Sequence, residues 1–124
     1  KWKPLATTLV LDLSISEISI RKIIQQLLSS GEFDFIYSLL SEYRNRTGKT
    51  DFYSIELGSY LSLRMSYEKS AQEYLLYLEN HPNQLQTVSD RIMAFPNDPN
   101  INATIKAVLI ESSLITLPML AVSN

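Results

Sequence analysis

The sequence of 124 residues contains no cysteine, one histidine (His81), three glycines and five prolines. Without cysteine the chain cannot form disulfide bonds, bind zinc through thiolates or use a cysteine nucleophile. A single histidine cannot by itself build a metal site. We therefore interpret His81, which directly precedes Pro82, as a surface residue that ends a helix. The sequence predicts no cofactor and no bound metal.

The sequence also lacks a charge excess of either sign and any long apolar run. Eleven Lys and Arg residues stand against 13 Asp and Glu residues, and the resulting net charge of −2 is spread along the chain. This balance argues against nucleic acid or an anionic membrane as a partner. No apolar run reaches the ~18 residues that a membrane span requires. No transmembrane segment is therefore expected.

Hydrophobic residues make up 45% of the chain, which is enough for a buried core of one domain or of a few stacked units. Near the N-terminus the apolar run Leu5–Leu11 is interrupted by Asp12, and no small-residue cleavage pattern follows. We expect residues 1–16 to form an arm or a partial helix. A second apolar stretch, Ile115–Val122, lies near the other end. Both apolar ends should pack against something, which allows a homo-oligomer.

Apolar residues recur at helical spacing through the middle of the chain. This spacing predicts sequential helices over residues 18–28, 33–46, 52–63, 67–80, 84–95 and 101–114. Ser14 and Glu17 are expected to form a capping box for the first helix, and Thr50 or Asp51 to cap the third. Gly48 is expected to end the second. Because the connections are short, we predict an all-α fold with antiparallel neighbours.

The predicted helices align in a register of 34 residues, with units at 17–50, 51–84 and 85–118. In the first two units Phe33 falls on Tyr67 without a gap. A helix–turn–helix unit of this length cannot bury both of its faces alone, so it stacks on its neighbours. A plain helical bundle with accidental spacing is the alternative interpretation.

The unit 51–84 resembles the tetratricopeptide repeat (TPR) family. Its Leu57-Gly58 pair stands where the family has Leu-Gly in the first helix, and Tyr67 matches the aromatic residue after the turn. Ser70 takes the place of the usual small residue, and Pro82 matches the closing proline. In the unit 17–50, Gly31 matches the glycine between the helices.

The sequence also departs from the TPR pattern. Met65 stands in the second unit where the first has Gly31, no Trp opens either unit, and the third unit has Arg91 and a longer turn, PNDPN. The resemblance implies antiparallel helix pairs stacked as a short right-handed α-solenoid. Residues 85–118 would be a degenerate third unit or cap, and residues 119–124 a tail.

No group of residues predicts catalysis, so a non-enzyme is expected. Thr47-Gly48-Lys49-Thr50 ends like a phosphate-binding loop, but Tyr43 stands where that motif needs glycine and a helix precedes it. We interpret the stretch as a helix stop. The charged residues nearby and on the later helices, namely Arg44, Arg46, Lys49, Glu42, Glu68 and Glu73, are interpreted as solvated surface.

The TPR resemblance implies that the first helix of each unit lines a concave groove. The implied groove residues are Arg21, Gln25 and Leu28 in the first unit, Phe52, Ile55, Ser59, Ser62 and Leu63 in the second, and Gln86, Ser89 and Met93 in the third. Family members that clamp a terminal carboxylate carry Asn where this chain has Glu56, so a peptide with apolar anchors is the expected ligand.

Two functions follow from the sequence. The first is a non-catalytic scaffold or assembly module that binds a protein or peptide partner in the groove. The alternative is a structural helical-repeat segment of a larger protein or complex, with no separate ligand. The sequence does not indicate a cellular compartment.

Overall fold

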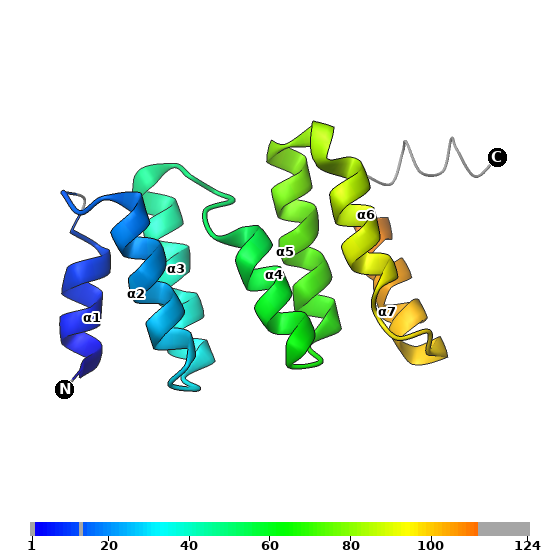
Figure 1. Cartoon of the computed structure of the whole chain (residues 1–124), viewed down its shortest axis with the longest axis horizontal. Coiled ribbons are helices and arrows are strands. Elements are labelled where there is room, and N and C mark those ends of the chain that lie inside the picture. The colour runs from blue at the N-terminus through cyan, green and yellow to red at the C-terminus, as the bar shows by residue number, and fades with distance from the viewer. Residues whose placement is uncertain (1, 13, 112–124) are drawn as a thin grey trace. The chain divides into compact units, whose positions relative to one another are not determined.

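The computed structural model describes residues 2–12 and 14–111, and this part of the chain contains seven α-helices, one 3-10 helix and no strand (Figure 1). The prediction of an all-α fold is therefore confirmed. The chain divides into two compact structural units, which differ from the three predicted repeats. The first structural unit ends at Phe52 and the second begins at Tyr53. From here on, the first and second units are these two. Each unit is described by itself. No helix among the described residues is long and apolar enough to span a membrane.

The first unit consists of α1 (Trp2–Val10), α2 (Glu17–Leu28) and α3 (Phe33–Thr47). Its most completely buried side chains come from all three helices: Val10, Ile20, Ile24, Ile36 and Leu40. These residues recur at helical spacing, so each helix presents one apolar face to the others. The segment predicted as an arm or partial helix thus contains the helix α1.

The predicted Ser14–Glu17 capping box is wrong. The residue that caps α2 is Ser16, whose Oγ accepts a hydrogen bond from the backbone N–H of Ser19 at 3.3 Å. Ser14 is instead held by Asp12, which accepts from both its hydroxyl (2.7 Å) and its N–H (3.0 Å). These two hydrogen bonds lower the pKa of Asp12, that from the hydroxyl most.

Gly48 ends α3, as predicted. Its φ of +74° is left-handed, and its N–H donates to the carbonyl of Arg44 at 2.9 Å. Arg44 itself is buried, and its Nε donates to the carbonyl of Phe52 at 2.9 Å. The interpretation of Arg44 as solvated surface is therefore wrong, because the chain after Gly48 folds back over this side chain.

The second unit consists of α4 (Ser54–Leu63), α5 (Tyr67–Asn80), the 3-10 helix η1 (Pro82–Gln84), α6 (Leu85–Met93) and α7 (Pro99–Glu111). The predicted cap of α4 at Thr50 or Asp51 is wrong. The helix was predicted to begin at Phe52, but it begins at Ser54. The Phe52 ring packs on Tyr43 at 4.6 Å, and its carbonyl is held by Arg44. Tyr53, at a φ of +64°, is the residue that leads into α4.

The helix α5 is the centre of the second unit, since it contacts α4, α6 and α7. A hydrophobic core cluster of this unit consists of Ala71, Tyr74, Leu75, Leu78, Val88 and Val108. The crossing with α4 is close at Gly58, whose carbonyl accepts a hydrogen bond from the buried Ser70 hydroxyl at 2.6 Å. The small residues Gly58 and Ser70 therefore allow the two helices to approach one another.

The later helix boundaries differ slightly from the prediction. The helix predicted over 84–95 ends at Met93, and the helix predicted from residue 101 begins at Pro99. This earlier start follows from Asp98, whose carboxylate accepts from the N–H groups of Asn100 (2.8 Å) and Ile101 (3.3 Å). The apolar stretch Ile115–Val122 lies outside the described residues, and the unit boundaries of the 34-residue register stay a prediction.

Candidate partner-binding surface

Of the predicted groove residues, Arg21, Gln25, Leu28 and Phe52 lie in the first structural unit, and only some of them are accessible. Leu28 and Phe52 are 4% and 3% exposed, so both are core residues and cannot present their side chains to a partner. The guanidinium of Arg21 lies over the Phe52 ring at 4.6 Å. Gln25 is exposed. The groove prediction is therefore corrected for Leu28 and Phe52, whose apolar side chains pack inward on their own unit.

The remaining predicted groove residues lie in the second structural unit, and their side chains differ in exposure. Ile55 is partly buried against the core, and Ser59, Ser62 and Ser89 are also partly buried. Gln86 is exposed and donates a hydrogen bond to the carboxylate of Asp90 at 2.8 Å. Leu63 and Met93 are the two exposed apolar residues of the set.

A hydrogen-bonded network joins three helices of the second unit. Arg91 of α6 donates through Nη1 to the hydroxyl of Ser59 on α4 at 2.6 Å, and that hydroxyl lies 3.2 Å from the Tyr74 hydroxyl of α5. Within the part of the chain that the structure describes, Arg91 makes no ion pair with a carboxylate. The network thus holds a cation at the surface with only neutral partners.

The sequence interpretation missed Arg91, which it treated only as a departure from the TPR pattern. In the predicted helix 84–95, Arg91 stands one turn before Phe95, an aromatic residue that packs against Tyr67 and Tyr74 although α6 itself ends at Met93. That spacing indicates the flank of α6 nearest the core. It does not indicate which neighbouring helix the long side chain reaches.

Three large apolar side chains are highly exposed at one end of the second unit. Leu63 is 85% exposed, Met65 74% and Met93 82%. Figure 1 shows α4 and α6 running in the same direction, so their C-terminal ends lie at the same end of the unit. We call the residues Ser59, Leu63, Met65, Arg91 and Met93 the α4–α6 surface.

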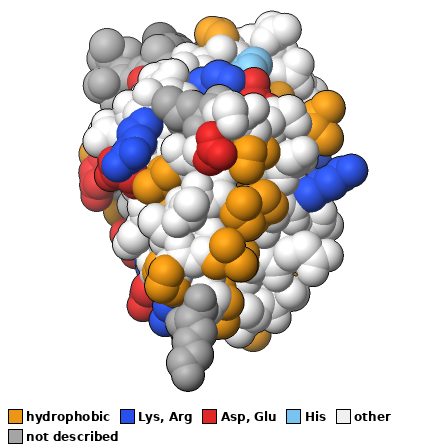
Figure 2. Space-filling model, turned by 90° about the vertical axis from the view of Figure 1, so that its left-hand side faces the viewer, with side chains coloured by type: hydrophobic (Ala, Val, Ile, Leu, Met, Phe, Trp, Pro, Cys, Tyr) orange, Lys and Arg blue, Asp and Glu red, His pale blue; other side chains and the backbone are white. Residues whose placement is uncertain are grey.

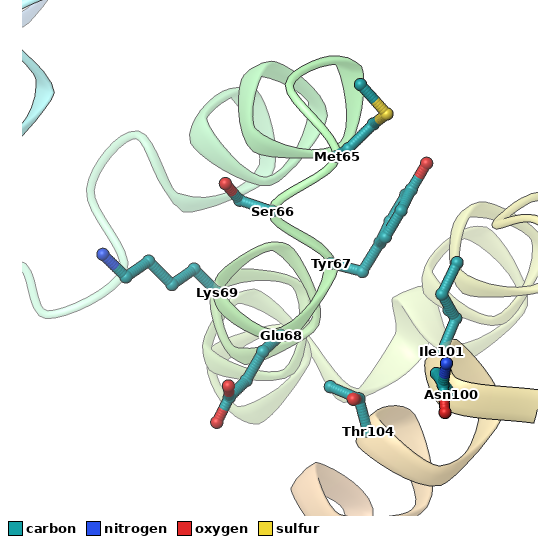
Figure 3. A pocket seen from close by; sticks show the side chains of 8 residues that line it. All are labelled: Met65, Ser66, Tyr67, Glu68, Lys69, Asn100, Ile101 and Thr104. Atoms are coloured by element: carbon teal, nitrogen blue, oxygen red, sulfur yellow. The ribbon is translucent and has the colours of Figure 1, made fainter.

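A pocket of about 370 Å³ lies between the first turn of α5 and the first turn of α7 (Figure 3). It is lined by Met65, Ser66, Tyr67, Glu68, Lys69, Asn100, Ile101 and Thr104. In Figure 3 Tyr67 and Ile101 lie on neighbouring sides of the pocket, and the Lys69 side chain extends away from Ile101. Met65 belongs both to this pocket and to the α4–α6 surface.

Two other candidate features are explained by local structure. The His81 ring stacks on Tyr77, with centroids 4.4 Å apart, and its Nδ1 lies 3.1 Å from the Tyr77 carbonyl at the end of α5. Lys49 of the TGKT stretch pairs with Glu17 at 2.5 Å, and this hydrogen bond lowers the Glu17 pKa. Across the described ranges, no three His, Asp or Glu side chains are placed to hold a metal ion.

The carboxylates interpreted as solvated differ in their surroundings. Glu42 pairs with Arg46 at 2.8 Å on the exposed face of α3, as expected for an i,i+4 pair. Glu73 is 3% exposed, so the interpretation is wrong for this residue. Its helix α5 is covered by other helices on more than one side, which the helical period alone does not reveal.

The chain was compared with models of known protein families, with curated proteins and with solved structures. None of the three comparisons gave a match.

Proposed function

We propose that this chain is a non-catalytic interaction module that binds a partner polypeptide at the α4–α6 surface. The observation that carries the proposal is the exposure of Leu63, Met65 and Met93 at one end of the second unit. Large apolar side chains exposed at the same end of a folded unit can mark an interaction site. Covering them would stabilise a complex by about 25 cal/mol for each Å² of apolar surface removed from water.

Arg91 adds a polar element to this surface. Its side chain is anchored by Ser59, which is itself beside Tyr74, so little rotational freedom would be lost on binding. A partner that places a carbonyl or carboxylate oxygen near Arg91 and apolar side chains near Leu63 and Met93 would match both features. An extended strand or an amphipathic helix could present such a pattern.

The repeat architecture belongs to the same proposal. The pairs α2–α3 and α4–α5 would be TPR-like units, and α6–α7 a degenerate third unit in a right-handed α-solenoid. The 34-residue register and the close crossing at Gly58 support this proposal. Small-angle X-ray scattering of the chain would test it, since a solenoid and a closed bundle of equal length differ in radius of gyration.

The partner-binding proposal is tested by capture from native lysate with the chain and its variants. Leu63→Glu and Met93→Glu each place a charge on the α4–α6 surface. Leu85→Glu is the matched control, because Leu85 is 54% exposed at the opposite end of α6. Circular dichroism first establishes that all four proteins are equally helical.

A partner identified by capture is then purified and titrated directly. We expect wild type and Leu85→Glu to bind equally, and the two surface variants to bind at least about tenfold more weakly, which corresponds to about 1.4 kcal/mol. Equal binding by all four proteins would contradict the proposed surface. Failure of every protein to capture a partner would favour the second candidate function.

The second candidate is a structural segment of a larger protein or complex. Ala6 and Val10 of α1 pack inward, whereas Trp2, Leu5 and Leu9 of the same helix are exposed. Figure 2, a view from the side of α1, shows apolar side chains gathered on this face. A helix that is apolar on both of its sides is expected to be covered in an assembly.

Sedimentation velocity tests this second candidate. If the α1 face packs in an assembly, wild type should self-associate or associate with its neighbours, and Leu5→Glu should reduce that association. A monomeric wild type that behaves like Leu5→Glu over a wide range of concentrations would remove the support for this function.

A further inference from the structure

The turn between α4 and α5 has an unusual residue at its critical position. Met65 has a φ of +62°, its N–H donates to the Ser62 carbonyl at 3.1 Å, and the N–H of Ser66 donates to the Leu61 carbonyl at 2.9 Å. These two hydrogen bonds form a Schellman motif, whose left-handed position is usually glycine. The corresponding turn after α2 follows that preference, with Gly31 at a φ of +82°.

A left-handed conformation is unfavourable for methionine because its Cβ crowds the following carbonyl. The Met65 side chain recovers little of this cost by burial, since it is 74% exposed. A strained residue that the core does not require is a reason to look for a function of its side chain. The Met65 side chain is one of those that line the pocket between α5 and α7 (Figure 3).

The lining of this pocket indicates what it can receive. Tyr67 and Ile101, together with Met65, give it apolar walls, and the Tyr67 ring is fixed by packing on Phe95 at 4.9 Å. The lining has one acidic and one basic residue, Glu68 and Lys69, and therefore no net charge, and the Lys69 side chain extends away from Ile101 (Figure 3). Apolar walls in a lining without net charge favour an uncharged, apolar group over an ion.

The volume of the pocket sets the size of that group. A volume of about 370 Å³ is at the lower end of the range for small-molecule sites, about 300–1,000 Å³. It has room for one large side chain, while the backbone that carries the side chain would stay outside. Met65 connects the pocket to the α4–α6 surface, so one polypeptide could occupy both.

We propose that the pocket receives one large apolar side chain, Leu, Met or Phe, of the partner polypeptide, and that Met65 closes over it as a specificity-determining contact. This inference rests on the proposed function for the source of the side chain. The chemical preference of the pocket is a property of the described residues and can be measured without the partner.

The experiment uses N-acetyl-phenylalanine amide and N-acetyl-leucine amide as probes, with N-acetyl-lysine amide and N-acetyl-glutamate amide as charged counterparts. Each is titrated into the full chain while the methyl signals of Met65 and Ile101 are followed by NMR. We expect the apolar probes to shift both signals, with millimolar Kd values, and the charged probes to shift them much less.

Two variants test the role of Met65. Met65→Gly should raise the Kd of the apolar probes by about fivefold or more. The same variant should also raise the urea midpoint of unfolding, or leave it unchanged, because glycine accepts the left-handed conformation. Leu85→Ala is the matched control, since Leu85 is also an exposed apolar residue but belongs neither to the pocket nor to the α4–α6 surface, and its probe affinity should equal that of wild type.

Several results would overturn the inference. These are equal shifts with charged and apolar probes, no shift up to the solubility limit, or a Met65→Gly variant that binds the probes as well as wild type. Partner capture without probe binding would overturn only this inference. Probe binding without capture of any partner would support the pocket's preference and contradict the proposed function.

Discussion

At Gly58 a missing side chain lets two helices meet. A Cβ added there would lie 2.6 Å from the Cδ1 and Cε1 atoms of Tyr74, whose ring is buried and cannot easily move. Elsewhere in a helix, glycine is less favourable than alanine by about 1 kcal/mol. At this position the crossing requires glycine for a steric reason that outweighs its poor helix propensity.

We therefore expect Gly58→Ala to lower the free energy of unfolding by about 1–3 kcal/mol, the usual cost of overpacking. Urea unfolding followed by circular dichroism measures this change. In Gly58→Ala/Tyr74→Leu the clash is relieved, so the two substitutions should cost less together than the sum of their separate effects. Strictly additive effects, or an unchanged single variant, would show that the crossing tolerates a methyl group.

The pair of Glu17 and Lys49 gives the first unit a dependence on pH. The hydrogen bond from Lys49 lowers the pKa of Glu17 in the folded chain. Its stabilisation is therefore complete above the ordinary Glu pKa of about 4.3 and is lost as the pH falls through the lower, folded pKa. Both side chains are 45% exposed, so the stabilisation is small.

Glu17→Gln should lower the free energy of unfolding at pH 7 by less than about 1 kcal/mol, and this difference from wild type should shrink below about pH 4. Unfolding by urea at several pH values measures it. Glu79→Gln is the control with the same change of charge, because Glu79 is exposed and makes no ion pair within the described part of the chain. A difference that grows on acidification would contradict the prediction.

At the scale of helices, the ends are decided by local signals where glycine or proline is present. Gly48 ends α3 in the left-handed conformation, and α5 ends at Asn80, two residues before Pro82. Both ends were predicted from the sequence, because these two residues restrict the backbone whatever surrounds them. The start of α4 was predicted wrongly, because the Phe52 ring and carbonyl are held by residues of α3.

Gly48→Ala should lower the free energy of unfolding by about 1–2 kcal/mol, since an added Cβ meets no atom within 4 Å and the cost is conformational alone. Gly48→Asn should cost less, because asparagine adopts the left-handed conformation more readily. Thermal unfolding of both variants measures the difference. Equal stability of Gly48→Ala and wild type would indicate that α3 can end in another way.

At the scale of the molecule, the second unit is organised around α5. This helix contacts α4, α6 and α7 and contributes the buried residues Ser70, Ala71, Glu73, Tyr74, Leu75 and Leu78. The helices α6 and α7 each contribute one buried residue, Val88 and Val108. Local opening should therefore be rarer in α5 than in its neighbours.

Hydrogen exchange followed by mass spectrometry tests this order. We expect amides of residues 71–78 to exchange most slowly in the second unit, and those of α6 to exchange at least about tenfold faster. The comparison within one unit is its own control, since solvent conditions are shared. Protection of α6 equal to that of α5 would mean that stability is spread evenly through the unit.

The sequence by itself determined that this chain is helical and where most helices end. Helical period, glycine and proline act over a few neighbouring residues, so this information is present in the order of amino acids alone. Whether the helix pairs are TPR-like repeats and what they bind are proposals that start from the same local patterns.

Only the tertiary structure decided which side chains are available for function. Arg44, Glu73 and Phe52 are buried, whereas Leu63 and Met93 are exposed, although the period alone does not separate these cases. The contact of Arg91 with Ser59 and the pocket beside Met65 join residues more than 30 positions apart. Such contacts depend on how whole helices pack, and packing is set by many side chains together.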